Sequence, residues 1–290
     1  GDVPALTALL GIAFGDTPVD TARFFASYND PSLIAVAESD GRFAAAGYLL
    51  PVGELAQANG RRAPCAMIYG VATRPEYRLR GLGGGIARRL VETGRARGFD
   101  AVVLHPADDG LFAFYARDGL FEEYFTCAER RITAPELANT PPATLLRTEP
   151  QSYREIRERL LADCAHIDFD ERALRFQAEL CGAGGFLRAV ELDACAAVEA
   201  RGGDVFVKEL LCAPEARGAE PELLAAIAAA FPAASYTVRV PGDASAPGMR
   251  FGMRASSTFG RTGLEDARAN PPGAVAADSR VNAWYGLDFN

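Results

Sequence analysis

The sequence predicts an α/β protein with a mixed sheet, built as two tandem domains of one kind. Three observations carry this prediction. An apolar run at residues 66–72 leads through a glycine-rich loop into a helical pattern at 86–97, which predicts a strand, a loop and a helix. Two helical patterns and a hairpin pattern precede that unit, and a similar succession of elements returns after residue 144. The length of 290 residues is ample for two domains.

The first domain is predicted over residues 1–133 from the spacing of its apolar residues. Leu6, Leu9 and Leu10 recur at helical spacing, and Asp40 with Gly41 marks the turn of a hairpin. The expected elements are helices at 2–15 and 18–28, strands at 32–38, 43–50 and 66–72, a helix at 86–97, a strand at 101–104, a short helix around Phe112 and a strand at 124–132.

Residues 134–143 are rich in Pro, Thr and Asn, which predicts a linker, and residues 144–290 are expected to form the second domain. A long irregular segment is expected at 250–278, where Gly, Ser and Pro recur. The other expected elements are strands at 145–147, 186–190, 194–199, 205–211, 235–240 and 281–289 and helices at 153–164, 171–181 and 220–231.

The glycine-rich loop at 78–84 predicts an anion site. Glycines between a strand and a helix leave backbone N–H groups bare beside the positive end of the helix, and such a nest binds phosphate. A Walker A loop is excluded, because it needs a Gly-Lys pair and the single lysine of the chain is Lys208. A dinucleotide fingerprint is disfavoured, because Ile86 stands where Gly or Ala is required. The alternative to an anion site is a glycine-rich helix start that serves tight packing alone.

A third pattern, Arg-x-x-Gly-x-Gly, is matched by Arg78, Gly81 and Gly83. It resembles the pyrophosphate loop of the GNAT superfamily, the acetyl-CoA-dependent N-acetyltransferases. The stretch from Phe112 to Phe121 is similar to the second signature of that family, a short helix with a Phe-Tyr pair and a later Gly-Phe pair, although Leu120 replaces the Phe. The two signatures stand in the family's order and cover roughly residues 1–133.

This resemblance implies roles for particular residues. Acetyl-CoA would be the co-substrate, and the N–H of Val71 would stabilise the oxyanion. Tyr115 matches the tyrosine that protonates the CoA thiolate as a general acid, while its alternative role is packing between helix and sheet. The implied CoA-binding residues are Val71, Ala72 and Thr73 for the pantetheine arm and Arg78, Leu79, Arg80, Gly81, Leu82, Gly83 and Gly84 for the pyrophosphate.

The general base is left open by the sequence. Many relatives carry a glutamate on the strand before the loop, but residues 65–70 of this chain contain no acid. Glu38 and His105 are candidates, and each has a structural alternative. In the enhanced-intracellular-survival acetyltransferases, which this chain resembles, the C-terminal carboxylate of the chain acts as the base. The C-terminal carboxylate of Asn290 is therefore a third candidate. If none of these groups is the base, water accepts the proton of the amine.

The second domain is expected to be degenerate. The segment that corresponds to the glycine loop, residues 213–220, keeps Gly218 and adds acids that would repel a pyrophosphate. Two such domains in one chain resemble the acetyltransferases of the enhanced-intracellular-survival group. We expect no third, sterol-carrier-like domain of the kind common there.

Composition narrows the function further. The net charge of −8 and the pI near 5.0 argue against a nucleic-acid partner and fit a cationic amine acceptor. Mean hydropathy is +0.00 and no stretch of about 20 apolar residues occurs, so no membrane span is expected. Six scattered cysteines predict reduced thiols in a cytoplasmic protein, and the start does not resemble a signal peptide. With His105 and His166 as the two histidines, no metal site is expected.

The sequence analysis thus favours an N-acetyltransferase that acts on a small-molecule or peptide amine. A CoA-binding sensor without catalysis is the alternative, motivated by the missing carboxylate on the loop strand. Transfer of a longer acyl group, acylation of a protein amine, and self-association to a homo-oligomer are left open.

Overall fold

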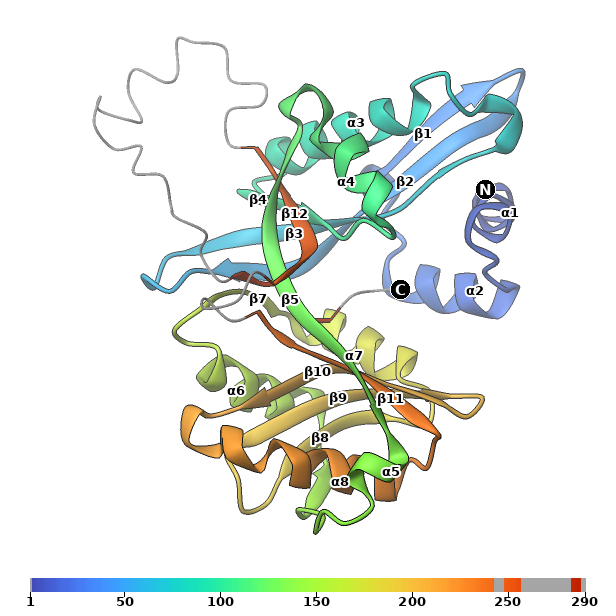
Figure 1. Ribbon diagram of the computed structural model, residues 1–290. Helices are drawn as coiled ribbons and strands as arrows, with labels where there is room; N and C mark the ends of the chain where they lie inside the picture. Colours follow the sequence, from blue (N-terminus) through green and yellow to red (C-terminus); the bar gives the residue numbers. More distant parts are fainter. Residues whose placement is uncertain (1, 243–247, 257–282, 288–290) are drawn as a thin grey trace. The chain divides into compact units, whose positions relative to one another are not determined.

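The computed structural model describes residues 2–242, 248–256 and 283–287 (Figure 1). The chain divides into two compact units, each made of segments that are distant in sequence. Unit 1 comprises Gly1–Glu54, Ala63–Tyr124 and Gly252–Arg280, and unit 2 comprises Leu55–Arg62, Phe125–Phe251 and Val281–Asn290. Within the described ranges, no helix is long and apolar enough to cross a membrane.

Unit 1 has a mixed sheet in the order β12-β4-β3-β2-β1. The β1–β2 pair is an antiparallel hairpin, β3 and β4 are parallel, and β12 joins β4 in antiparallel register. The elements of unit 1 are α1 (Val3–Phe14), α2 (Pro18–Ser27), β1 (Ile34–Ser39), β2 (Arg42–Ala56), β3 (Arg62–Thr73), α3 (Leu82–Ala96), β4 (Ala101–Leu104), α4 (Asp109–Ala116), the start of β5 (Phe121–Thr133) and the end of β12 (Met249–Ala255).

The core of unit 1 lies between α3 and the sheet. Ile86 and Leu90 on α3 are buried there together with Val102 of β4. Two glycines set the close approach of helix and sheet. A Cβ at Gly47 would lie 2.7 Å from Ile86 Cγ2, and one at Gly94 would lie 2.8 Å from Val102 Cγ2. Close packing of these side chains fixes β3, before the glycine loop, and α3, after it, relative to each other.

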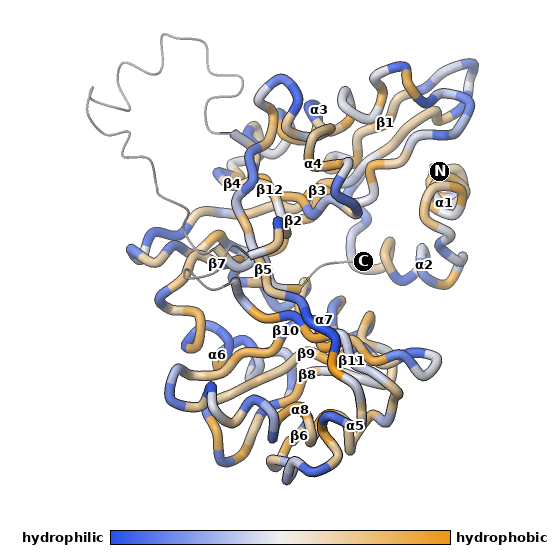
Figure 2. The backbone as a smooth tube through the Cα atoms, viewed as in Figure 1, coloured by the Kyte–Doolittle hydropathy of each residue, from blue (hydrophilic) through white to orange (hydrophobic). Residues whose placement is uncertain are grey.

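Unit 2 has a sheet in the order β7-β13-β5-β11-β10-β9-β8-β6. Figure 2 shows hydrophobic residues along β9 and β10, and several of these residues belong to the hydrophobic core of this unit. Its elements are the rest of β5, α5 (Ala134–Leu137), β6 (Leu145–Arg147), α6 (Pro150–Leu160), β7 (Ala165–Phe169), α7 (Glu171–Leu180), β8 (Gly185–Ala189), β9 (Ala194–Arg201), β10 (Asp204–Cys212), α8 (Glu220–Ala230), β11 (Ser235–Pro241) and β13 (Ala283–Trp284).

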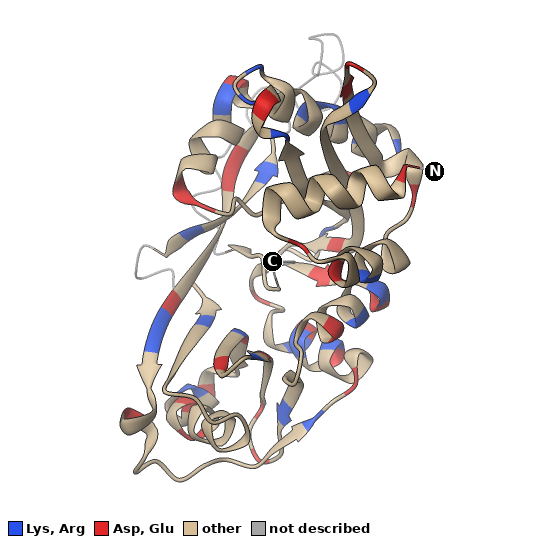
Figure 3. Ribbon diagram, turned by 90° about the vertical axis from the view of Figure 1, so that its right-hand side faces the viewer, with Lys and Arg blue, Asp and Glu red and all other residues tan. Residues whose placement is uncertain are grey.

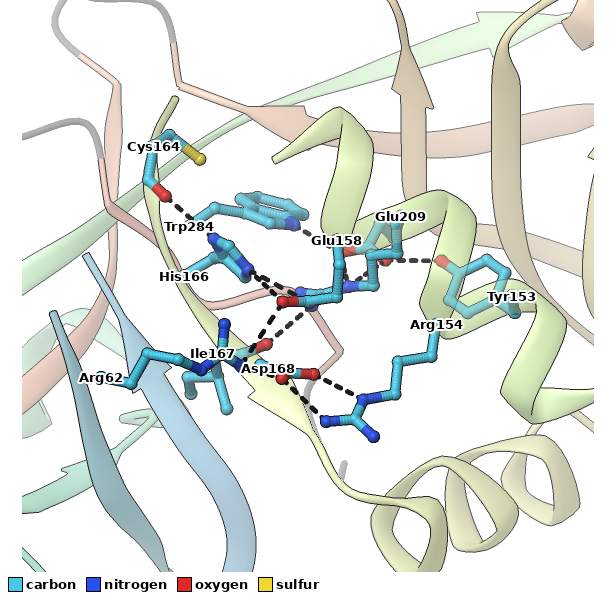
Figure 4. A network of polar contacts seen from close by, with 11 residues as sticks. Arg62, Tyr153, Arg154, Glu158, Cys164, His166, Ile167, Asp168, Glu209 and Trp284 are labelled. Carbon is cyan, nitrogen blue, oxygen red and sulfur yellow. Dashed lines mark hydrogen bonds and ion pairs between the residues drawn. The ribbon is translucent and has the colours of Figure 1, made fainter. Parts of the chain in front are cut away.

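A buried polar network holds unit 2 together around Glu209 of β10 (Figure 4). Glu209 is fully buried and accepts hydrogen bonds from the Tyr153 hydroxyl, from Arg157 Nε at 2.9 Å and from Trp284 Nε1. Burial, followed by the Glu209 charge, raises the pKa of Tyr153. The network therefore anchors β13 inside unit 2. Removal of one partner would leave a charge buried without compensation.

Most predicted elements are confirmed, but the strand β7 was missed. The helices expected at 153–164 and 171–181 are α6 and α7, and β7 lies between them. All five residues of β7 are buried, including two polar ones. His166 contacts Glu158 at 3.0 Å, and Asp168 accepts from Arg154 Nε at 2.7 Å. Such polar residues are buried because they have hydrogen-bond partners. A strand that contains them is not recognised from hydropathy alone.

Two expectations for the end of the chain need correction. The irregular segment expected at 250–278 is wrong at its start, because β12 is a strand in which Met253 pairs with Leu104. Residues 257–278 lie outside the described residues. The strand expected at 281–289 is shorter where it is described: β13 ends at Trp284, and residues 285–287 are not strand. The remaining residues of that prediction, 281–282 and 288–289, lie outside the description.

The domain ranges 1–133 and 144–290 stay a prediction. The compact units follow them only partly, because unit 1 takes in 252–280, while unit 2 takes in 55–62 and β5 from Phe125 onward. The predicted linker 134–143 opens with the short helix α5, which Thr133 and Glu136 cap reciprocally.

Candidate functional site

The site begins with a one-residue slip in β3. Ile68 faces the core under α3, and a strand would next present residues 70 and 72 on that side. Instead Val71 packs against this core, and a Cβ on Gly83 of α3 would lie 3.9 Å from Val71 and 3.7 Å from Thr73. The intervening Gly70 has a φ of 60°. A left-handed glycine with a change of face is the geometry of a β-bulge, which turns the end of β3.

The same end of β3 is not paired with β4. The described register joins Cys65–Met67 of β3 to Ala101–Val103 of β4, and β3 continues to Thr73. Backbone groups beyond Met67 on that side therefore have no partner from β4. Such groups can bind an extended substrate as an added strand would.

The loop after β3 presents backbone N–H groups at the start of α3. Gly81 has a φ of 77° and supplies no side-chain cap. The first helical hydrogen bond of the described chain here runs from Gly85 N to Gly81 O at 3.0 Å, so the N–H groups of Leu82, Gly83 and Gly84 precede it without a protein acceptor. A Cβ added at Gly81 or Gly84 would meet no atom within 4 Å, whereas one at Gly83 would lie 3.4 Å from Phe114 Cζ, so the space beside Gly81 and Gly84 is open.

Leu79 gives the loop its unusual conformation. Its φ of 63° is left-handed, and its side chain is 106% exposed. Exposure of a leucine in a strained conformation costs free energy, typically about 1 kcal/mol or more for the backbone alone. Strain of this kind marks a loop shaped for binding.

The charges around the loop favour an anion. Arg78 Nε donates to Thr73 O at 3.3 Å, and an Arg80 guanidinium nitrogen donates to Glu76 O at 3.0 Å, so each arginine folds back on the loop. Both side chains are exposed, and the first turn of α3 contains no acid. The bare amides, the helix dipole and two guanidinium groups are the donor set that a pyrophosphate requires. The residues present therefore fit the phosphates of a CoA-type co-substrate.

The second sequence motif lies beside this loop. A Cβ on Gly83 would be 3.4 Å from Phe114 Cζ of α4, and Arg88 of α3 forms an exposed ion pair with Asp118 at 3.5 Å. The structure thus brings the two predicted signatures together. Phe112 is a buried core residue, as expected.

Tyr115 is half-buried on α4, and its ring packs edge-on against Phe114 at 5.0 Å and Phe121 at 5.9 Å. Its hydroxyl makes no hydrogen bond with any residue in the described part of the chain. Burial raises the pKa of Tyr115 to about 12. The hydroxyl is therefore protonated at physiological pH and available as a donor.

The candidate bases lie on other elements. Glu38 is exposed on β1, where the register with β2 shifts between Ala37 and Glu38. His105 is half-buried and directly follows β4. Neither is on β3 or in the α3 loop. The third candidate, Asn290, lies outside the described residues.

Sequence reasoning missed a group of residues on the opposite face of β3. Tyr69 of β3 packs there with Phe24 of α2, which also packs against Tyr48 of β2; these rings share no local motif, so the glycine signature did not reveal them. Among the described residues, no group of three or more His, Cys, Asp or Glu side chains is arranged to hold a metal ion. None of the six cysteines, all of which lie in the described part of the chain, forms a disulfide.

Comparisons with known proteins agree with this geometry. Residues 1–122 match the family model of the acetyltransferase (GNAT) domain. A comparison with curated proteins found no match. Among solved structures, the chain is similar to a GCN5-related N-acetyltransferase from Kribbella flavida (TM-score 0.64, 18% identity, 87% of this chain and 68% of that one). It is also similar to Eis1 from Mycobacterium abscessus, with a TM-score of 0.55 and 14% identity over 82% of this chain and 62% of that one.

A third similar structure is a tandem GNAT protein from the clavulanic acid biosynthesis pathway, with a TM-score of 0.53 and 17% identity over 87% of this chain and 94% of that one. Identities at this level establish the fold, while the family model concerns the sequence of the first 122 residues. Residues 1–122 therefore match the GNAT acetyltransferase domain in sequence, and the chain has the fold of a tandem GNAT protein.

Proposed function

We propose that the chain is an acetyl-CoA-dependent N-acetyltransferase that acts on a primary amine. The observation that carries the proposal is the start of α3, where three successive amides have no protein acceptor and lie next to the end of β3 that β4 does not pair. Acetyl-CoA supplies the activated acetyl group as a thioester. Its pyrophosphate would be bound by residues 78–84, and its pantetheine arm by Val71, Ala72 and Thr73.

The reaction joins the amine nitrogen to the acetyl carbon and breaks the carbon–sulfur bond. The amine loses one proton overall, and the departing sulfur gains one. In this proposal the Val71 N–H donates to the carbonyl oxygen as negative charge develops there, a contact that is typically worth about 3–4 kcal/mol in such sites. Binding both reactants in one orientation lowers the barrier further.

Tyr115 is proposed to supply the proton at sulfur. An ordinary thiol has a pKa of about 8.5, well below the value of about 12 for Tyr115, so complete transfer from the phenol is uphill. The tyrosine therefore acts first as a hydrogen-bond donor that stabilises the leaving sulfur, and the proton follows as the bond breaks. The proton of the amine leaves to water, with Glu38 and His105 as the alternatives on neighbouring elements.

The partners and the compartment follow from charge and thiols. The net charge of −8 favours a cationic acceptor over nucleic acid. Six cysteines without a disulfide are typical of a reducing compartment, so we place the reaction in the cytoplasm. Transfer of a longer acyl group, a protein amine as acceptor, and a homo-oligomeric state are compatible with this proposal.

Two assays on the same protein test the proposal. Isothermal titration with acetyl-CoA should give one binding site per chain, and a thiol-release assay with a panel of amines should show amine-dependent release of CoA. Absence of heat at high micromolar acetyl-CoA would overturn the proposal. Binding without thiol release from any amine would favour the second candidate, a CoA-binding sensor, which the lack of an acid on the β3 end supports.

A further inference from the structure

The loop before α3 is fastened to the β1–β2 hairpin. Arg74 donates from its backbone N–H to Ala44 O at 2.9 Å and from its Nε to Phe43 O at 2.8 Å. The hydroxyl of Tyr77 donates to the carboxylate of Asp40 at 3.2 Å. Figure 1 shows the chain after β3 beside the turn of this hairpin. The hairpin therefore holds the segment that leads to the bare amides of α3.

The turn of the hairpin fixes the acceptor of the Tyr77 hydroxyl. Asp40 has a left-handed φ of 53°, a conformation that aspartate adopts more readily than most residues. Its Oδ2 accepts from the Ser39 hydroxyl at 3.1 Å as well as from Tyr77. Tyr77 is 8% exposed, so its ring has little freedom to move. We call the hydrogen bond from Tyr77 to Asp40 the tether.

The ring of Tyr77 contacts the guanidinium of Arg80. Arg80 Cζ lies 5.1 Å from the centroid of the ring, within the range of about 6 Å for a cation–π contact. A second contact runs from an Arg80 guanidinium nitrogen to Glu76 O at 3.0 Å. The two contacts restrict a side chain that is otherwise exposed. A side chain that is ordered before a ligand arrives loses less entropy on binding it.

Arg80 keeps its charge available for an anion. Figure 3 shows acidic and basic residues close together at several places in unit 1, and Arg88 of α3 pairs with Asp118 at 3.5 Å. Arg80 has no ion pair with any residue that the structure describes. A guanidinium has five N–H donors, and Glu76 O accepts one of them. Arg80 stands two residues before Leu82, the first of the bare amides, so its remaining donors suit a phosphate oxygen.

We propose that Tyr77 is a positioning residue for the co-substrate: its ring, held by the tether to Asp40, keeps Arg80 in place to bind a phosphate of acetyl-CoA. The part that concerns acetyl-CoA rests on the proposed N-acetyltransferase activity. Tyr77 acts on the phosphate through Arg80. Because the tether ends at the hairpin, a change at its turn alters the affinity for the co-substrate.

The direction of the effect at Asp40 separates the tether from charge. Asp40→Gly removes the carboxylate and keeps the backbone conformation, because glycine adopts a left-handed φ without strain. Loss of a negative charge near the loop would by itself strengthen the binding of an anion. The tether predicts the opposite, a Kd for acetyl-CoA that rises about threefold by calorimetry, as expected for one lost hydrogen bond.

Two further variants control this measurement. Asp40→Asn loses the charge but keeps an acceptor oxygen, so its Kd should stay within about twofold of the wild-type value. Asp100→Gly removes an exposed carboxylate beyond the far end of α3 and should bind acetyl-CoA as the wild type does. Tighter binding by Asp40→Gly than by the wild type would overturn the proposal.

A double-mutant cycle tests whether Tyr77 acts through Arg80. Tyr77→Leu and Arg80→Gln should each weaken acetyl-CoA binding by about three- to tenfold, as expected for an exposed guanidinium with screened charge. In the Arg80→Gln background, Tyr77→Leu should weaken binding by less than about twofold more. Tyr77→Leu removes no charge, yet it should make the slope of log Kd against log salt shallower. An unchanged slope, or losses that add in the double variant, would overturn the proposal.

Tyr77→Phe keeps the ring and removes the tether alone. Its Kd should rise about threefold, as in Asp40→Gly, and the two changes together should weaken binding no more than either does alone. These two variants decide the question if Tyr77→Leu does not fold, because both leave the packed ring in place. Additive losses in the Asp40→Gly, Tyr77→Phe double variant would contradict the tether.

Failure of the proposed function is distinguishable from failure of this inference. Equal binding of acetyl-CoA by the wild type and Tyr77→Leu would support the proposed function and overturn the inference. If acetyl-CoA gives no heat with the wild type, the proposed function fails, and inorganic pyrophosphate is the probe. The wild type should then bind pyrophosphate at least about threefold more tightly than Tyr77→Leu. Absence of pyrophosphate binding to the wild type, or equal binding by both proteins, would overturn the inference.

Discussion

The segment from β3 to α3 in unit 1 and the segment from β10 to α8 in unit 2 are built alike. Thr73-Arg74-Pro75-Glu76 corresponds to Cys212-Ala213-Pro214-Glu215, and each run enters a 3-10 turn, η2 (Pro75–Tyr77) or η4 (Pro214–Ala219). Each turn leads into a helix. The parallel pairing with the next strand ends early in both, at Met67 in β3 and at Val207 in β10.

Both strands also carry a bulge at the corresponding place. The faces of β3 slip at Gly70, and the register of β10 with β9 shifts between Val207 and Glu209. Gly70 and Glu209 stand at equal distances before the shared proline. The two units therefore retain one strand geometry.

The two units differ in the residues that stand at the end of the strand and at the start of the helix. In unit 1 the bulge is a glycine and the helix starts with bare amides. In unit 2 the residue after the bulged Lys208 is Glu209, the centre of the buried polar network, and α8 starts with Glu220, Pro221 and Glu222. Proline has no N–H, and two acids repel an anion. We call the β3-to-α3 segment the open scaffold, because its helix start has amides free to bind a ligand. We call the β10-to-α8 segment the filled scaffold, because buried side chains occupy the same position and stabilise the unit.

The largest expected effect concerns the filled scaffold. Glu209→Ala should destabilise unit 2 by about 3–5 kcal/mol, because the Arg157 guanidinium would remain buried without its carboxylate. The single tryptophan, Trp284, lies in this unit, so its fluorescence in urea reports on it. Glu215→Ala, at an exposed position, should change the unfolding free energy by less than about 0.5 kcal/mol. Equal losses in the two variants would show that Glu209 is not the anchor.

The next effect tests the open scaffold. Gly83→Glu should weaken acetyl-CoA binding at least about 100-fold, or about 2.7 kcal/mol, by placing a negative charge among the bare amides. The matched change in unit 2, Gly218→Glu, should leave the Kd unaltered by calorimetry. If both variants bind as the wild type does, the anion site lies elsewhere.

A smaller effect is expected at the proton donor. Tyr115→Phe should lower kcat by roughly 10- to 100-fold and alter the Kd for acetyl-CoA by less than about threefold. The active form is the protonated one, and the raised pKa of about 12 means that activity is lost only as pH rises toward that value. The pH profile of kcat should therefore show no decline due to this tyrosine between pH 7 and about 10. A profile in which Tyr115→Phe abolishes a decline near neutrality would contradict this assignment.

The smallest effect is expected for the loop arginines. Arg78→Gln should weaken acetyl-CoA binding by about three- to tenfold, because the exposed guanidinium acts through screened charge. The slope of log Kd against log salt should become shallower in this variant. An unchanged slope would mean that Arg78 serves the loop through its bond to Thr73 alone.

The parts of the fold that local patterns encode were predictable from sequence. The two glycine-containing signatures predicted the order of β3, α3, β4 and α4, because apolar spacing and glycines reflect local geometry. The strand β7 was missed because its buried His166 and Asp168 depend on partners from α6. The Tyr48 group escaped for a similar reason, since its members meet through tertiary packing.

The most direct test of the account is a crystal structure of the chain with CoA bound. The account predicts one CoA per chain, with its pyrophosphate oxygens within hydrogen-bond distance of the N–H groups of Leu82, Gly83 and Gly84. CoA bound at the start of α8, or a pyrophosphate that makes no contact with those three amides, would contradict it.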